Sequence, residues 1–327
     1  MLHQLRFAAL CCGIVSASGA YASCGSTACS INTNWDEHII REPGLSLDLR
    51  YSYSRADQLR SGSSKIVADT TFAGEVENLR TVNKITTLSA DYTADEHWGL
   101  VTNIPYVTRD HNHNIGPYAG AVPAGYESFY AQSLGDIKVV GRYRWTLDEA
   151  EHSAAGFKFG LKLNTGRRDF TLNTGVKPNE VTLQPGNGST DLILGAFWNQ
   201  ATPGDAWSWF AQGMLQSSVR NDAAFRPGNQ INLDAGTRYA FSSGLSGLLQ
   251  LNTQWNATDS GTGAALSPIS GGPSSGGRSV SLTPGLSYAI MTDTHLYGLL
   301  QLPLYQFVNG EQLTASKSLT VGINQRF

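Results

Sequence analysis

Two stretches near opposite ends of the sequence alternate between apolar and polar side chains. In residues 45–54 every odd position is apolar or aromatic and every even position is polar or charged. Residues 319–327 continue the pattern, with one face formed by Leu319, Val321, Ile323 and Phe327. Successive side chains of a β-strand point to opposite faces of its sheet, so this period predicts strands with one apolar and one polar face.

The placement of these two strands favours a barrel. In a soluble sheet, an edge strand that ends in Phe327 would invite pairing with other chains. In an outer-membrane barrel the last strand pairs with the first, its apolar face contacts lipid and its polar face lines the lumen. For either strand alone, a soluble sandwich with one solvated face is the alternative.

The N-terminus has the features of a secretory signal peptide. Arg6 precedes an apolar run at residues 7–15, and Ala20 and Ala22 supply the small residues of a cleavage site. No window in the chain holds the roughly 18 consecutive apolar residues that a spanning helix requires. With 15 % charged residues, the composition is typical of neither a helical membrane protein nor a disordered chain. We predict a signal peptide at residues 1–22.

Residues 23–43 are predicted to form a periplasmic N-terminal segment. It contains Cys24 and Cys29, which we expect to form a disulfide in an oxidising periplasm. A lipid anchor on Cys24 is the alternative, but Tyr21 stands where such a signal has Leu. Without Arg6 the chain carries 22 Lys and Arg against 26 Asp and Glu. This net charge of -4 gives no reason to expect a nucleic-acid partner.

About twelve strand-like segments follow from residue 44 onward, each close to the length that a tilted membrane strand requires. We predict strands at residues 44–55, 80–93, 98–108, 135–146, 155–165, 190–200, 206–217, 230–241, 245–256, 279–290, 295–307 and 315–327. The connections between them alternate between short and long. Short periplasmic turns and long extracellular loops are typical of a barrel with both termini in the periplasm.

Aromatic residues support the same orientation. Trp98, Trp145, Trp198, Trp207 and Trp209 all fall beside predicted short turns, as in the aromatic girdle of a membrane barrel. The residues assigned to the outer girdle are Tyr51, Tyr53, Tyr106 and Trp255. A soluble sandwich does not explain this banding. We therefore predict an all-β, up-and-down antiparallel barrel of about twelve strands, residues 44–327, in the outer membrane of a Gram-negative cell.

The alternation also assigns the charged residues to the lumen, because an Arg or Lys that faces lipid near mid-membrane costs about 2 to 4 kcal/mol. The predicted lumen residues are Asp48, Arg50, Asp136, Lys138, Arg142, Arg144, Lys158, Lys162, Asp191, Asp234, Arg238, Tyr297 and Tyr305. Two interpretations remain open for the charges. They guide an anionic or polarisable solute, or they form salt bridges that only stiffen the wall.

Several motifs resemble a known family. The clearest is Leu-Gln-Pro-Gly-Asn-Gly-Ser-Thr-Asp at residues 183–191, followed by residues 104–106, 134–136, 141–144 and 162–166. In this combination the chain resembles the outer-membrane family named for the meta-pathway of phenol degradation, although Asn164 stands where that family usually has Pro. The resemblance implies a transporter-like barrel for aromatic or other hydrophobic solutes, and it defines no catalytic residues.

An enzyme is the second functional class. An outer-membrane lipase requires a histidine beside a strand serine on the outer side of the lipid face. Only His111 and His113 fall on that side, and no nucleophile, base and orienting group can be placed together. We therefore predict no catalytic residues. The two histidines, together with Asp110, form a candidate metal site for Zn or Cu, with ordinary polar loop residues as the alternative.

These observations predict a channel or transporter for small, aromatic or hydrophobic solutes. A structural or surface-interaction barrel with a metal-binding extracellular loop is the alternative. The expected partners are outer-membrane lipid, a small-molecule solute, and periplasmic or assembly-machinery proteins. We predict no cofactor.

Overall fold

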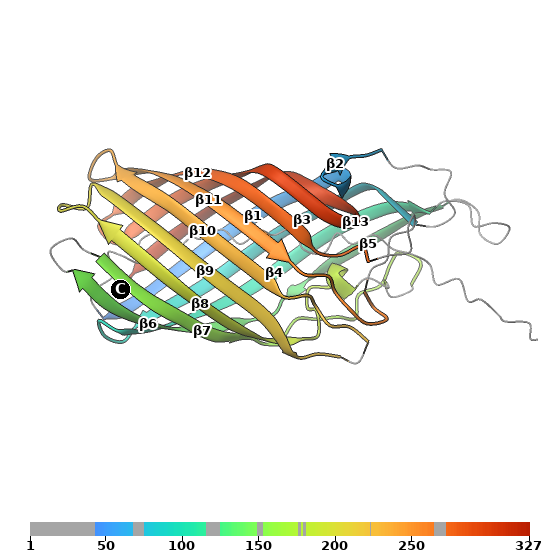
Figure 1. Cartoon of the computed structure of the whole chain (residues 1–327), viewed down its shortest axis with the longest axis horizontal. Coiled ribbons are helices and arrows are strands. Elements are labelled where there is room, and N and C mark those ends of the chain that lie inside the picture. The colour runs from blue at the N-terminus through green and yellow to red at the C-terminus, as the bar shows by residue number, and fades with distance from the viewer. Residues whose placement is uncertain are drawn as a thin grey trace, which may run out of the picture.

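Strand β1 (Gly44–Gly62) pairs antiparallel with the end of β13 (Thr294–Arg326), and this pairing closes the sheet into a barrel (Figure 1). Leu49 lies opposite Ile323 and Tyr51 lies opposite Val321. The two alternating stretches of the sequence are therefore neighbours, as predicted. The computed structural model describes residues 43–67, 75–115, 125–148, 153–175, 178, 181–222, 224–264 and 273–327.

The remaining elements follow in chain order. They are β2 (Ser64–Lys65), β3 (Glu75–Thr93), β4 (Trp98–Ile115), β5 (Gly125–Leu134), β6 (Lys138–Asp148), β7 (Ser153–Lys162), the short helix η1 (Val181–Leu183), β8 (Thr190–Ala201), β9 (Trp207–Arg220), β10 (Gln230–Ala240), β11 (Leu245–Asn256) and β12 (Gly277–Met291). No helix in the described part of the chain is long and apolar enough to cross a membrane.

Consecutive wall strands are hydrogen-bonded neighbours, in the order β13, β12, β11, β10, β9, β8, β7, β6, β4, β3 and β1. Strand β13 crosses the wall twice. Its first part pairs with β12, its last part pairs with β1, and Val308 is the residue at which the two pairings meet. Eleven strand elements thus close the barrel, and the doubled β13 makes them twelve crossings, as the alternation predicts.

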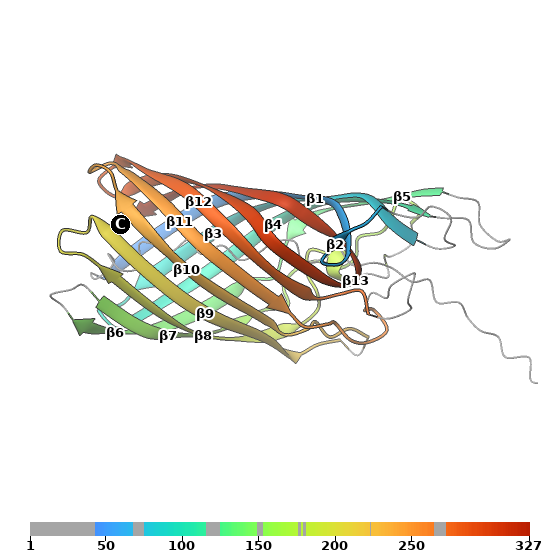
Figure 2. The same cartoon turned by 45° about the horizontal axis from the view of Figure 1, so that its top comes forward.

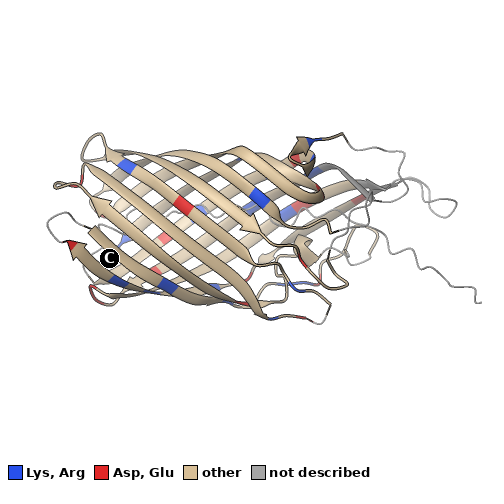
Figure 3. Cartoon of the chain, in the orientation of Figure 1, with Lys and Arg blue, Asp and Glu red and all other residues tan. Residues whose placement is uncertain are grey.

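The two faces of the wall differ as a membrane barrel requires. Alternate residues such as Leu49, Phe159, Leu194 and Leu251 are 43 to 49 % exposed on the outside, although they are apolar. Inward neighbours such as Asp48, Lys158 and Asn252 are buried and polar, and charged residues lie at several heights along the barrel (Figure 3). An apolar exterior around a polar interior is the pattern of a strand sheet in lipid.

Aromatic rings gather beside the short turns, which lie at the left end of the barrel in Figures 1 and 2. Trp207 stacks on Trp209 at a centroid distance of 6.1 Å and contacts Tyr239 at 4.6 Å. On the strands before them, Trp98 meets the ring of Tyr143 edge-on at 4.8 Å. This is the belt that anchors a barrel at the membrane interface.

At the opposite end the strands run further than the sequence predicts. Strand β1 continues to Gly62 and β4 to Ile115, and β5 occupies residues that we expected to be a loop. Beyond the membrane neither face of a strand has to be apolar, so the side chains need not alternate in polarity. The predicted signal peptide and the Cys24 and Cys29 disulfide lie outside the described residues.

Candidate solute-binding cavity

Within the described residues, the barrel wall is interrupted between β5 and β6. Strands β5 and β6 form one wall strand that breaks at residues 135–137, because β4 pairs with β5 along its outer half and with β6 along its inner half. Strand β6 also pairs with β7, whereas β5 pairs with β4 alone among the named strands of the described chain. The described part of residues 163–189 (163–175, 178 and 181–189), which we call the closing segment, completes the wall beside β5.

Backbone and apolar contacts hold the closing segment against β5. Leu172 forms an isolated β-bridge with Phe129, and the amide of Asn173 donates a 2.9 Å hydrogen bond to the carbonyl of Ser128. Phe129 and Leu183 are buried together in one apolar cluster. The segment is therefore a packed part of the wall rather than a free loop.

Lys162, the last residue of β7, fixes the base of the closing segment. Its Nζ donates to Asp136 Oδ2 at 2.9 Å, Asn187 Oδ1 at 2.7 Å and the carbonyl of Ser189 at 2.7 Å. Asp191 Oδ2 lies 3.5 Å away. An ammonium group has three protons to donate, and these partners satisfy all of them inside the wall.

Asp136 binds the same segment from the other side. It accepts hydrogen bonds from the backbone amides of Gly166 at 2.9 Å and Thr165 at 3.2 Å. Gly166 and Gly186 approach so closely that a Cβ on Gly166 would lie 2.6 Å from the Gly186 Cα. Three motifs that the sequence marks separately, at residues 134–136, 162–166 and 183–191, therefore meet at one joint.

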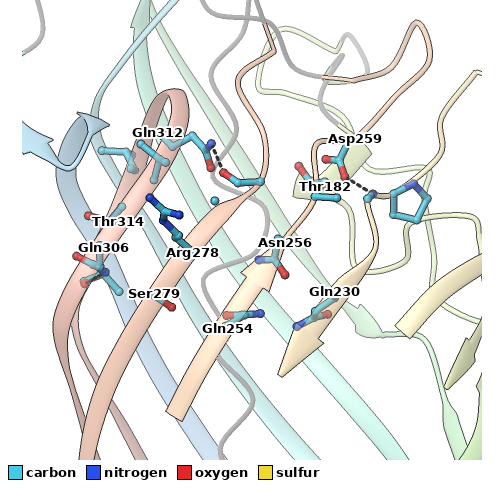
Figure 4. Close-up of a pocket in the computed structure, with 18 of the residues that line it drawn as sticks. Thr182, Gln230, Gln254, Asn256, Asp259, Arg278, Ser279, Gln306, Gln312 and Thr314 are labelled. Atoms are coloured by element: carbon cyan, nitrogen blue, oxygen red, sulfur yellow. Dashed lines mark hydrogen bonds between the residues drawn. The ribbon is translucent and has the colours of Figure 1, made fainter. Parts of the chain in front are cut away.

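A cavity of about 300 Å³ lies between the closing segment and strands β10 to β13 (Figure 4). It sits at the end of the barrel that carries the long connections. Its lining has eight Asn and Gln side chains, four charged residues and a single aromatic residue, Phe307. Gln254 and Asn256 on β11 and Gln230 on β10 extend along one side of this space (Figure 4). The polar part of the lining is therefore formed mainly by uncharged hydrogen-bonding groups.

Below the cavity the lumen is filled by a hydrogen-bonded ladder of side chains. Lys158 donates to Gln212 at 3.2 Å, and Gln212 donates to Asp234 at 2.9 Å. Asp234 also accepts from Asn252 at 2.7 Å, and Asn252 accepts from Thr283 at 2.6 Å. This ladder joins side chains of five strands, β7, β9, β10, β11 and β12. In both Gln212 and Asn252, the amide oxygen accepts a hydrogen bond and the amide nitrogen donates one.

An apolar cluster also fills the lumen. Phe210, Leu248, Tyr297 and Leu299 are between 1 and 9 % exposed and pack together on inward positions. The Tyr297 hydroxyl donates to Asp48 at 2.8 Å. The sequence places these positions inside by phase, but an inward Leu or Phe carries no charge that would single it out. Together with the ladder, the cluster packs the space beneath the cavity with side chains.

Most predicted lumen residues are indeed buried or half-buried. Arg142 donates to both carboxylate oxygens of Asp91 at 2.6 Å near the short-turn end. Arg50 donates to Asp48 at 2.9 Å, and Lys138 donates to Gln216 at 3.0 Å. Arg144 is buried and Arg238 half-buried.

Tyr305 is a correction. We expected it to face the lumen, yet it is 40 % exposed. A β-bulge sets Ser281 opposite Pro303 but Val280 opposite Tyr305, which inserts one extra residue into β13. A single inserted residue moves every later side chain to the other face. Gln306 lines the cavity in place of Tyr305.

The two candidate metal ligands form a buried hydrogen-bonded chain instead. His111 Nδ1 lies 2.8 Å from Thr81 Oγ1, and His111 Nε2 lies 3.0 Å from His113 Nδ1. His113 Nε2 lies 3.2 Å from Glu127. Asp110 accepts a hydrogen bond from Asn112 Nδ2 at 2.8 Å. Across the described ranges, no group of three or more His, Cys, Asp or Glu residues is placed to hold a metal ion.

The protonation of this histidine chain follows from its partners. A Glu127 carboxylate accepts from His113 Nε2–H, so His113 Nδ1 accepts from His111 Nε2–H, and His111 Nδ1 accepts from Thr81. Both rings are then neutral. Burial lowers the pKa of His111 to about 3, with added repulsion from His113 and Arg109. Burial also lowers the pKa of His113, against the opposing effect of Glu127.

Comparison with known proteins decides the family. The family model described as putative MetA-pathway of phenol degradation matches residues 56–306. The chain belongs to this family. The match covers the wall break, the closing segment and most of the cavity lining, so the resemblance predicted from residues 183–191 is confirmed. No curated protein matches the sequence.

Among solved structures, the COG4313 outer membrane channel from Pseudomonas putida F1 has the same fold, with a TM-score of 0.61 and 14 % identity over 88 % of this chain and 96 % of that one. The P. putida toluene transporter TodX matches with a TM-score of 0.48 and 8 % identity, covering 90 % of this chain and 92 % of its own. The NanC porin has a TM-score of 0.47 and 11 % identity, over 86 and 100 % of the two chains.

Proposed function

We propose that the protein is a channel for small solutes in the outer membrane of a Gram-negative cell. The observation that carries this proposal is a cavity of about 300 Å³ inside a closed barrel with an apolar exterior. Cavities of this size are typical of small-molecule sites. Membership of the phenol-degradation family and the fold shared with an outer membrane channel support it.

The solutes that we propose include aromatic compounds of the kind that the family description names. A solute that enters the cavity meets the ladder and the apolar cluster beneath it, so passage requires these side chains to move apart. We therefore propose a channel with a narrow, side-chain-gated middle section. Its charged residues serve chiefly as paired groups in the wall, since Arg142 and Lys162 each bind a carboxylate.

Conductance of single channels in a lipid bilayer tests this proposal. Leu299 is 1 % exposed in the lumen, whereas its neighbour Leu300 is 37 % exposed on the outer face. Leu299→Ala should widen the packed section and raise conductance, and Leu300→Ala is the matched control that should leave it unchanged. Equal conductance in both variants and the wild type would refute a route through the middle of the barrel.

A structural or surface-interaction barrel is the second candidate, and the packed lumen favours it. Such a barrel would conduct no better after Leu299→Ala, so the same measurement separates the two. We propose no catalytic role. A lipase site must face lipid, whereas His111 and His113 are only 0 and 2 % exposed and bonded to each other.

A further inference from the structure

The ladder and the cavity share strands but differ in how their polar groups are satisfied. In the ladder, Asn252 on β11 and Thr283 on β12 are both hydrogen-bonded. One inward position above Asn252, Gln254 is 6 % exposed, and its Nε2 has no hydrogen-bond partner within the described part of the chain. A buried polar atom without a partner costs free energy, so its retention requires a reason.

Two further groups on the adjacent strands share this property. Gln301 on β13 is 2 % exposed and its Nε2 is unpaired, and Ser281 on β12 is 1 % exposed with an unpaired hydroxyl, both judged against the described residues. Gln254 and Gln301 line the cavity. The pairing register places Ser281 opposite Asn252, between the strands that carry the two glutamines. The three groups therefore lie on one patch of inner wall, which we call the amide floor.

Three other amides of the lining are already engaged. Gln184 bonds both the amide and the carbonyl of Phe170, and Gln312 donates to two backbone carbonyls. Gln306 donates to the carbonyl of Ala315. These residues build the cavity, while the Nε2 atoms of Gln254 and Gln301 and the Ser281 hydroxyl are buried without a hydrogen-bond partner among the described residues.

The chemistry of the amide floor defines a ligand class. A side-chain amide donates through its nitrogen and accepts through its oxygen, and a serine hydroxyl does both. A solute hydroxyl has the same dual capacity. None of the three groups carries a charge. Of the two arginines in the lining, Arg109 donates to Asn83 and to the carbonyl of Thr182, and the guanidinium of Arg278 lies over the Phe307 ring. An organic anion therefore gains no ion pair at the floor, and a hydrocarbon would leave all three groups unpaired.

We propose that the amide floor is a binding site for an uncharged small solute that carries several hydroxyl groups. This inference rests on the proposed channel function and names its solute class. Two kinds of molecule share that chemistry, an aromatic diol and a non-aromatic polyol. Phe307, the one aromatic residue of the lining, is stacked by Arg278 at 4.9 Å from its ring centroid.

Titration calorimetry on the purified full-length protein tests the proposal, with catechol, myo-inositol, toluene and benzoate as probes. The variant is Gln254→Met together with Gln301→Met, which keeps an unbranched side chain of similar length. We expect catechol or myo-inositol to bind the wild type and to bind the variant about tenfold more weakly, since a hydrogen bond between uncharged groups contributes roughly that factor. Binding of catechol but not myo-inositol would identify the solute as an aromatic diol, and binding of myo-inositol but not catechol would identify it as a non-aromatic polyol.

Thermal unfolding of the same proteins provides the control. The double variant removes no hydrogen bond within the protein, so its midpoint should equal that of the wild type. Asn252→Leu, one inward position below Gln254, breaks the ladder and should lower the midpoint of thermal unfolding. A lower midpoint for the double variant with unchanged binding would show a purely structural role and overturn the proposal.

Toluene or benzoate that binds the wild type and the variant equally well would also overturn it, as would a wild type that binds neither hydroxylated probe. These outcomes leave the channel proposal standing if Leu299→Ala still raises conductance. The converse result, binding of catechol or myo-inositol without any conductance, would refute the channel and retain the site.

Discussion

Lys162 Nζ lies 2.9 Å from Asp136 Oδ2, and this contact joins the end of β7 to the point where the next wall strand breaks. The two residues are 5 and 9 % exposed at their side chains. Two residues of the family motif at residues 183–191, Asn187 and Ser189, also bind Lys162 directly. Where the backbone pairing of β7 with β6 stops, the Lys162–Asp136 ion pair and the closing segment continue the wall.

Replacement of Lys162 by Met should strongly destabilise the barrel. Removing one partner of a buried pair leaves Asp136 and Asp191 charged and uncompensated, which costs about 3 to 5 kcal/mol. The measurement is urea unfolding in detergent, followed by the mobility of the folded barrel on unheated gels. Lys317→Met, at an exposed position, is the control and should change the free energy of unfolding little. Equal stability of both variants would contradict this role of Lys162.

Replacement of Arg142 and Lys158 together by Glu distinguishes paired wall charges from a solute path. Arg142 binds Asp91, and Lys158 binds Gln212 and lies 5.1 Å from the Phe197 ring centroid. We expect a large loss of heat resistance, because a carboxylate at position 142 would face the carboxylate of Asp91. Adding Asp91→Arg should restore part of the lost heat resistance. Ion selectivity, measured as reversal potential, would change instead if these residues line the conducting path.

The histidine chain should make the outer ends of β4 and β5 sensitive to acid. The folded pKa of His111 is about 3, below its ordinary value of 6.5. The unfolded chain therefore binds a proton that the folded chain rejects, and stability is lost as pH falls below about 6.5. Hydrogen exchange of the backbone amides at pH 7 and pH 4.5 measures this, after correction for intrinsic rates. His111→Gln should reduce the difference, and an undiminished difference would exclude His111 as its source.

The predictions for the N-terminus are independent of the barrel. We expect cleavage after Ala22, because small residues there suit a signal peptidase, and a disulfide between Cys24 and Cys29 in the secreted protein. Mass spectrometry of the mature protein, with and without thiol labelling, measures both. Retention of residues 1–22 would contradict export, and two labelled thiols would contradict the disulfide.

The sequence by itself determined the closed barrel and its two faces. Lipid forbids unpaired backbone and exposed charge, so every membrane-embedded strand must alternate, and the period is visible in residues such as Leu49 and Arg50. The same constraint explains where the prediction stopped. Beyond the membrane no face has to be apolar, so the outer half of β4 and the whole of β5 carried no period to detect.

Only the tertiary structure decided how the interior is used. Burial inside the lumen depends on which side chains meet across the barrel, and the sequence does not encode those distances in any local pattern. Leu299 and Gln301 both read as inward positions, yet the first fills the lumen and the second lines a cavity. The bulge beside Pro303 turned Tyr305 outward, because one extra residue in a strand reverses the phase of all that follow.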